Sequence, residues 1–129
     1  MFLDRLNENQ QGVLLSLAMQ LMFADGRQRP EETALIAALR RQVGAAVVPV
    51  QAATGELAGI YATRPARIAL MLELMGVALV DREFHAAEQD FIGAVAQALQ
   101  IGESELSDMQ SWVARQFVLV REAESFLEA

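Results

Sequence analysis

Apolar and polar residues follow one another along the chain in a pattern that predicts two similar pairs of helices. Residues 11–24 are apolar almost all round and contain no proline, which is typical of a buried helix. Residues 30–43 predict the next helix, because proline stands at its first position and acidic residues occupy its first turn. This helix is amphipathic. The order then recurs, since residues 65–80 predict a second apolar helix and residues 86–99 a second amphipathic one.

The remaining segments predict a connection and one more helix. Residues 44–63 are interpreted as a connection with a short helix at about residues 55–61, and residues 47–50 as either a short strand or a buried connection. Gly102 precedes a last helix of about twenty residues. The expected fold is an all-α single domain of about six or seven helices, with repeat halves at about 11–44 and 67–102 and a C-terminal helix at about 103–125.

A pair of acidic residues stands where the apolar helix of each half gives way to the amphipathic one. Asp25 lies seven residues before Glu32, and Asp81 lies seven residues before Glu88, so the two pairs are offset by 56 residues. Each pair stands between an apolar helix and an amphipathic one. An internal repeat of this kind predicts two pseudo-symmetric halves that bury their apolar faces against each other.

The net charge is −7, and the excess of acid lies in the second half of the chain. Residues 1–64 hold six arginines and six acidic residues, whereas residues 65–129 hold four arginines and eleven acidic residues. Because an acidic half repels a phosphate backbone, nucleic acid is not an expected partner. A cation or a basic protein surface is favoured instead.

Composition excludes several kinds of site. The chain has no cysteine, which removes disulfides, thiolate nucleophiles and cysteine-based zinc or iron–sulfur sites. No nucleophile–base set, phosphate-binding loop or cofactor motif is present, so an enzyme is not expected.

The longest apolar run, residues 68–80, is shorter than the ~20 residues of a membrane-spanning helix. A cytoplasmic protein is expected rather than an integral membrane protein, since no signal segment is recognised.

The two Asp–Glu pairs allow a structural and a functional interpretation. Glu32 and Glu88 fall in the first turn of a helix, where a glutamate can bind a free backbone amide and complement the helix dipole. Asp25 and Asp81 would then satisfy amides of the loops. The functional alternative is a divalent cation, because calcium and magnesium take carboxylate and carbonyl oxygens as ligands. The structural role is favoured, since the dense acidic spacing of an EF-hand is missing.

The single histidine extends the second pair. His85 precedes Glu88 by three residues, so both can project from one helix start beside Asp81. Histidine and carboxylates together can hold zinc, iron or manganese. The first copy has Arg29 at the equivalent position, so it offers no symmetric second ligand set. Because the chain has one histidine and no cysteine, a tight zinc site is not expected. The alternative is that His85 caps the helix or packs on Phe84.

Trp112 lies off the main apolar stripe of the last helix. Together with Val118, Leu119 and Phe126 it forms a candidate apolar surface, and exposed patches of this kind mark sites for protein partners. The alternative is that Trp112 packs under residues 47–50.

Glu73 is the one charged residue inside the apolar run at residues 68–80. Burial of an unpaired carboxylate is costly. Glu73 is therefore expected either to reach an arginine such as Arg67 or to lie at the rim of its helix.

The repeated motif and its surroundings resemble the TerB-like family of tellurite-resistance proteins. The resemblance runs from about Leu14 to about Val120. It is carried by Ala24-Asp25-Gly26 with Pro30-Glu31-Glu32 in the first half, and by Phe84-His85, Glu88, Phe91-Ile92, Leu99, Gly102 and Glu105-Leu106 in the second. The family usually has glycine after the second aspartate, where this chain has Arg82.

The resemblance implies an all-helical bundle that acts without catalysis in tellurite resistance or a wider stress response, as an interaction or metal-responsive module. Its partner would be a protein, such as another tellurite-resistance or stress protein, some of which are membrane-bound. The alternative function is divalent-metal binding, and no other cofactor is implied. The residues that would hold the metal are Asp25, Glu32, Asp81, His85 and Glu88, and those of the partner surface are Trp112, Leu119 and Phe126.

Overall fold

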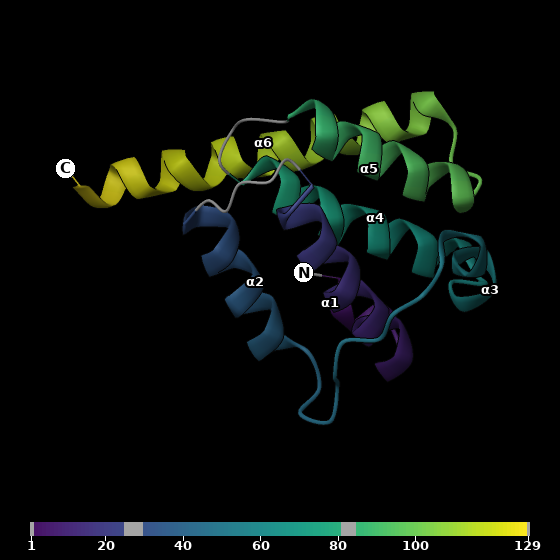
Figure 1. Ribbon diagram of the computed structural model, residues 1–129. Coiled ribbons are helices and arrows are strands. Elements are labelled where there is room, and N and C mark those ends of the chain that lie inside the picture. The colour runs from purple at the N-terminus through teal and green to yellow at the C-terminus, as the bar shows by residue number, and fades with distance from the viewer. Residues whose placement is uncertain (1, 25–29, 81–84, 129) are drawn as a thin grey trace.

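Helix α4 (Arg64–Leu79) runs through the middle of the molecule, and the other long helices pack against it (Figure 1). These helices are α1 (Glu8–Met22), α2 (Pro30–Gln42), α5 (Ala86–Ala98) and α6 (Glu103–Glu128). The structure is a computed structural model that describes residues 2–24, 30–80 and 85–128. Within these ranges the all-α prediction is confirmed, because they contain no strand.

The connection between α2 and α4 contains the short elements of the fold. Helix α3 (Leu57–Ile60) and the 3₁₀ turn η2 (Thr54–Glu56) lie where the sequence predicts a short helix, and a further 3₁₀ turn, η1 (Leu3–Arg5), precedes α1. Residues 47–50 form an irregular connection, so the strand interpretation is wrong. Two valines of this connection, Val47 and Val50, pack against the core.

The core lies between α1 and α4, the two helices whose sequences are apolar almost all round. Neighbouring helices cover each of them on several sides, so neither can keep a broad polar face. Ten of their side chains are at most 1% exposed: Val13, Leu14, Leu15, Ala18 and Leu21 of α1, and Leu70, Met71, Leu74, Met75 and Ala78 of α4.

Helix α1 begins three residues before the predicted start, because a capping box precedes it. The Asn7 side chain accepts a hydrogen bond from the backbone N–H of Gln10 at 2.8 Å, and the Gln10 side chain accepts one from the N–H of Asn7 at 2.9 Å. The Gln10 amide also donates to the carbonyl of Ile60. The buried Tyr61 hydroxyl donates to the carbonyl of Gln10 at 2.6 Å, and its burial raises the pKa of Tyr61 above the usual value. The start of α1 is thus bound to the end of α3.

Arg67 of α4 holds the ends of two other helices. Its guanidinium donates to the carbonyls of Ala58 and Tyr61, at the end of α3, at 3.1 and 2.7 Å. It also donates to the carbonyl of Leu99, at the end of α5, at 3.2 Å. Carbonyls at helix ends have no partner within their own helix, and a planar guanidinium can serve several of them at once.

Gly12 allows the connection to cross α1 closely. The N–H of Val50 donates to the carbonyl of Gly12 at 2.9 Å. A Cβ atom on Gly12 would lie 2.5 Å from the carbonyl oxygen of Val48 and 2.8 Å from a Val50 methyl group. The approach therefore requires the absence of a side chain.

The hydrogen bonds of Arg67 predict that its replacement by lysine lowers the stability of the fold. Arg67→Lys keeps the charge but has no planar fork, so it leaves at least one carbonyl unpaired. We expect the free energy of unfolding to fall by about 1–3 kcal/mol in urea titrations. Arg64→Lys is the matched control, because Arg64 is exposed and pairs with Glu105 at the surface. Equal melting temperatures of the two variants would contradict this role of Arg67.

The close crossing at Gly12 predicts opposite effects of alanine at two helical glycines. Gly12→Ala places a methyl group against the Val48 carbonyl, and we expect it to cost about 1–3 kcal/mol in thermal unfolding. Gly93→Ala in α5 meets no atom within 4 Å and improves helix propensity, so it should stabilise the fold by about 0.5–1 kcal/mol. A stabilising Gly12→Ala would show that the crossing is not tight.

Candidate interaction site

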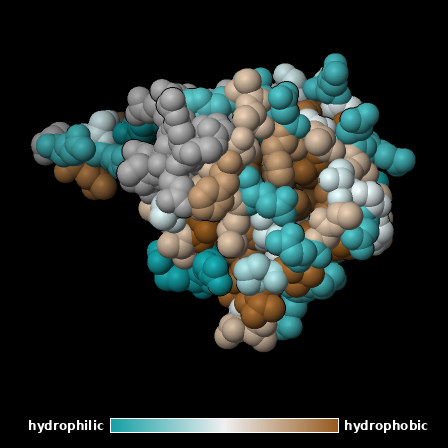
Figure 2. Space-filling view, viewed as in Figure 1, coloured by the Kyte–Doolittle hydropathy of each residue, from teal (hydrophilic) through white to brown (hydrophobic). Residues whose placement is uncertain are grey.

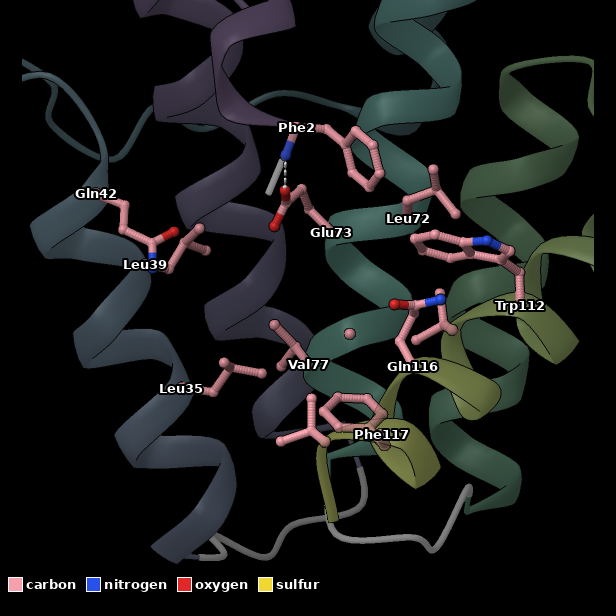
Figure 3. A pocket seen from close by; sticks show the side chains of 13 residues that line it. Phe2, Leu35, Leu39, Gln42, Leu72, Glu73, Val77, Trp112, Gln116 and Phe117 are labelled. Carbon is pink, nitrogen blue, oxygen red and sulfur yellow. Dashed lines mark hydrogen bonds between the residues drawn. The ribbon is translucent and has the colours of Figure 1, made fainter. Parts of the chain in front are cut away.

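Helices α2 and α6 both pack on α4, and a groove with a volume of about 260 Å³ lies between them (Figure 3). Its floor is formed by α4, its walls by α2 and α6, and Phe2 lies at one end. Its polar residues are Gln42, Glu73 and Gln116, and its apolar residues are Phe2, Leu35, Leu39, Leu72, Gly76, Val77, Trp112, Val113, Phe117 and Val120. The groove therefore offers a largely apolar surface with a few polar groups, which is the usual character of a binding site.

A glycine in the floor helps to keep the groove open. Gly76 lies on α4, and a Cβ atom added there would meet nothing within 4 Å outside its own helix turns. The neighbouring large side chains of α4 fill the space above the helix, whereas Gly76 leaves the space above it empty. The glycine costs helix stability relative to alanine, and nothing in the packing around α4 requires it.

Glu73 supplies the charged group of the groove. It is half-buried, and its carboxylate accepts a hydrogen bond from the backbone N–H of Phe2 at 2.6 Å (Figure 3). This position agrees with the expected rim placement. Arg67, the other expected partner, donates to backbone carbonyls instead. The contact binds the N-terminal segment to α4 and places Phe2 beside the groove.

Trp112 forms part of the α6 wall. It is half-buried, and its ring packs against that of Phe2 with centroids 5.9 Å apart and an interplanar angle of 54°. Figure 3 shows Phe2, Leu72 and Trp112 together at this end of the groove. Sequence reasoning considered residues 47–50 as the cover of Trp112 and missed Phe2, because no local pattern links the two ends of the chain.

The C-terminal part of α6 extends beyond the body of the molecule. Figures 1 and 2 show this end standing clear of the other helices. The helix has 26 residues, where the sequence predicts about twenty. We call residues 119–128 the tail. Its large apolar side chains are exposed: Leu119 by 55%, Val120 by 54%, Phe126 by 80% and Leu127 by 86%.

The exposed side chains of the tail continue the apolar stripe of the groove wall. Residues seven apart lie on the same side of a helix, two turns further along. Trp112 is followed at this spacing by Leu119 and Phe126, and Val113 is followed by Val120 and Leu127. The first member of each series lies in the groove, and the last is almost fully exposed.

The structure thus separates the predicted partner surface into two connected parts. Trp112 lines the groove, whereas Leu119 and Phe126 lie on the tail. The sequence did not predict the α2 wall or the α4 floor. The glycine inside an apolar helix, Gly76, was the local signal for the floor, but only the fold reveals that α2 lies opposite α6.

The acidic pairs are described only in part. Asp25 and Asp81 lie outside the described residues, as does the side chain of Glu32. On the backbone, Glu32 is the third residue of α2 and Glu88 the third residue of α5, in agreement with the predicted first-turn positions. Glu88 is 1% exposed.

His85, the residue immediately before α5, lies between the two members of the second acidic pair in the sequence. His85 occupies the N-cap position, but its side chain forms no capping hydrogen bond. Phe84, the other neighbour considered for its ring, is outside the described residues. Figure 1 shows the C-terminal ends of α1 and α4 on the same side of the molecule as the first turns of α2 and α5. Among the residues with described positions, no group of three metal-ligating side chains forms.

No helix within the described parts of the chain is both long and apolar enough to cross a membrane.

Comparison with known proteins identifies a family for the chain. The family model described as tellurite resistance protein TerB matches residues 41–111, which is more than half of the chain. The match includes α4 and the second acidic pair and leaves the first pair outside. No curated protein and no solved structure matches the chain significantly. On the strength of the family match, the chain belongs to the TerB family of tellurite-resistance proteins.

Proposed function

We propose that the chain is a non-enzymatic, cytoplasmic interaction domain of the tellurite-resistance type, which binds a protein through its groove and tail. The observation that carries this proposal is the continuous apolar surface along α6, half-buried at Trp112 and exposed at Phe126. A monomeric protein rarely exposes large apolar side chains together unless a partner covers them.

The shape and composition of the groove favour a helical partner segment. An apolar floor between two helical walls is an arrangement that can receive the apolar face of an amphipathic helix. Aromatic residues are the usual source of binding energy in such sites, and Phe2, Trp112 and Phe117 supply them here. Gln42 and Gln116 on opposite walls can bind the polar edge of the guest helix.

A photo-crosslinking experiment in the native host tests the interaction. A benzophenone amino acid at Gln116 or Phe126 should capture the partner, because both positions belong to the continuous apolar surface. The same group at Val48 is the matched control, since Val48 is 65% exposed and does not line the groove. We expect discrete crosslinked species from the first two positions only.

A groove-filling variant completes this test. Gly76→Leu adds a side chain to the open floor and should reduce the capture from Gln116 about tenfold without lowering the melting temperature. The absence of crosslinks at both Gln116 and Phe126, or equal capture from Val48, would contradict the proposed function.

The second candidate function is binding of a divalent metal by the acidic pairs. It is favoured by the burial of the Glu88 carboxylate in the first turn of α5, next to His85. Buried carboxylates are held by hydrogen bonds, ion pairs or metals. Asp25, Glu32 and Asp81 would complete the ligand set, and calcium or magnesium suits carboxylate oxygens better than zinc.

Thermal unfolding tests the metal candidate. If a site forms, millimolar calcium, magnesium, zinc or manganese should raise the melting temperature by about 3 °C or more, because only the folded chain binds the ion. The rise should disappear in the Asp81→Asn/Glu88→Gln variant and persist in Glu103→Gln, which changes an exposed acid at the start of α6. An unchanged melting temperature with all four ions would remove this candidate.

A further inference from the structure

We propose that the groove receives the tail of a second copy of the chain, so that two copies exchange their tails in a two-fold symmetric dimer. This inference rests on the proposed function, since it identifies the partner of the same surface. The partner is a second copy because one chain carries both an apolar groove and an apolar helix of matching character.

The tail needs a cover that its own body does not provide. Phe126 and Leu127 are 80% and 86% exposed, and Ala123 lies between them and Val120 on the same side of α6. Val120 belongs to both the groove and the tail, and it is 54% exposed. The apolar surface is therefore continuous from one copy's groove to the segment that would enter the other copy's groove.

The tail cannot fold back into its own groove. It continues the helix that forms one wall of that groove, and it points away from the body (Figure 1). Residues 103–128 contain neither glycine nor proline, the residues at which a helix most readily bends. An intramolecular contact would require a break in an unbroken helix, whereas an intermolecular contact requires none.

The charged groups of the tail lie outside its apolar stripe. The tail carries Glu122, Glu124 and Glu128 against a single arginine, and all three glutamates are exposed. Arg40 and Arg41 of α2 are exposed as well, but neither lines the groove, whose one charged side chain is that of Glu73. The proposed contact therefore rests on apolar residues rather than on charge.

Symmetry accounts for a closed pair rather than a chain of copies. Each copy offers one groove and one tail, so a two-fold axis satisfies both contacts at once and leaves neither exposed. Two such contacts, each about three turns of helix in a groove, approach the area of roughly 1,200 Å² that a specific interface needs.

The oligomeric state of the purified chain provides the first test. Sedimentation equilibrium across micromolar to millimolar concentrations should show conversion from 14.1 kDa to twice that mass. Phe126→Asp and Gly76→Leu should each weaken the dimer about tenfold or more, since one removes the guest side chain and the other fills the groove. Val48→Asp and Gly93→Leu are controls that change an exposed valine and an open glycine elsewhere, and they should leave the dimer intact.

A mixing experiment makes the test specific for tail exchange. The Phe126→Asp chain keeps its groove and the Gly76→Leu chain keeps its tail, so an equimolar mixture can restore one contact of the two. We expect heterodimers in the mixture at concentrations where each variant alone is monomeric. Recovery on mixing also shows that both variants fold.

The remaining outcomes overturn the inference in distinguishable ways. A dimer that Phe126→Asp abolishes and Gly76→Leu leaves intact would mean that tails pack on each other. A chain that stays monomeric up to millimolar concentration would also exclude the exchange. If such a monomer still gives crosslinks to another protein at Gln116, the proposed interaction function stands and its partner is a foreign helix.

Discussion

The burial of α4 is the constraint on which the rest of the structure depends. An apolar helix with almost no polar face must be covered on all sides, and α1, α2, α5 and α6 each pack against it. Of its three charged side chains, Arg64 lies at the surface and the other two hold neighbouring segments in place. Arg67 binds the carbonyl ends of α3 and α5, and Glu73 binds the backbone of Phe2. Polar groups near the core thus fix the positions of neighbouring segments instead of opposing burial.

The groove is a consequence of the same packing. Two helices that both lie on α4 leave a trough between them when the side chain at its base is missing, as at Gly76. Filling that space with alanine would improve helix propensity, so the glycine lowers stability without a packing reason. A position that sacrifices stability in this way is typical of a functional surface. The half-buried Trp112 beside it supports the same conclusion.

Much of the fold could be predicted from the sequence, because periodicity reports which face of a helix is buried. The starts at Pro30 and His85-Ala86 follow from local signals, and the first-turn positions of Glu32 and Glu88 follow with them. The site could be predicted only where one helix carries it, as on the α6 surface. The groove joins α2, α4, α6 and Phe2, and no local pattern records that these segments meet. The ligand roles of Asp25 and Asp81 stay predictions, since both lie outside the described residues.

The distribution of charge bears on the exposure of the tail. Eleven acidic residues stand against four arginines in the second half of the chain. The tail holds three of these acids beside its apolar stripe, and Arg40 and Arg41 lie on α2 outside the lining of the groove. Charge on the tail also keeps exposed Phe126 and Leu127 soluble before they are covered. The acidic residues beside the apolar side chains of the tail therefore allow this helix end to be exposed while the chain stays soluble until it binds.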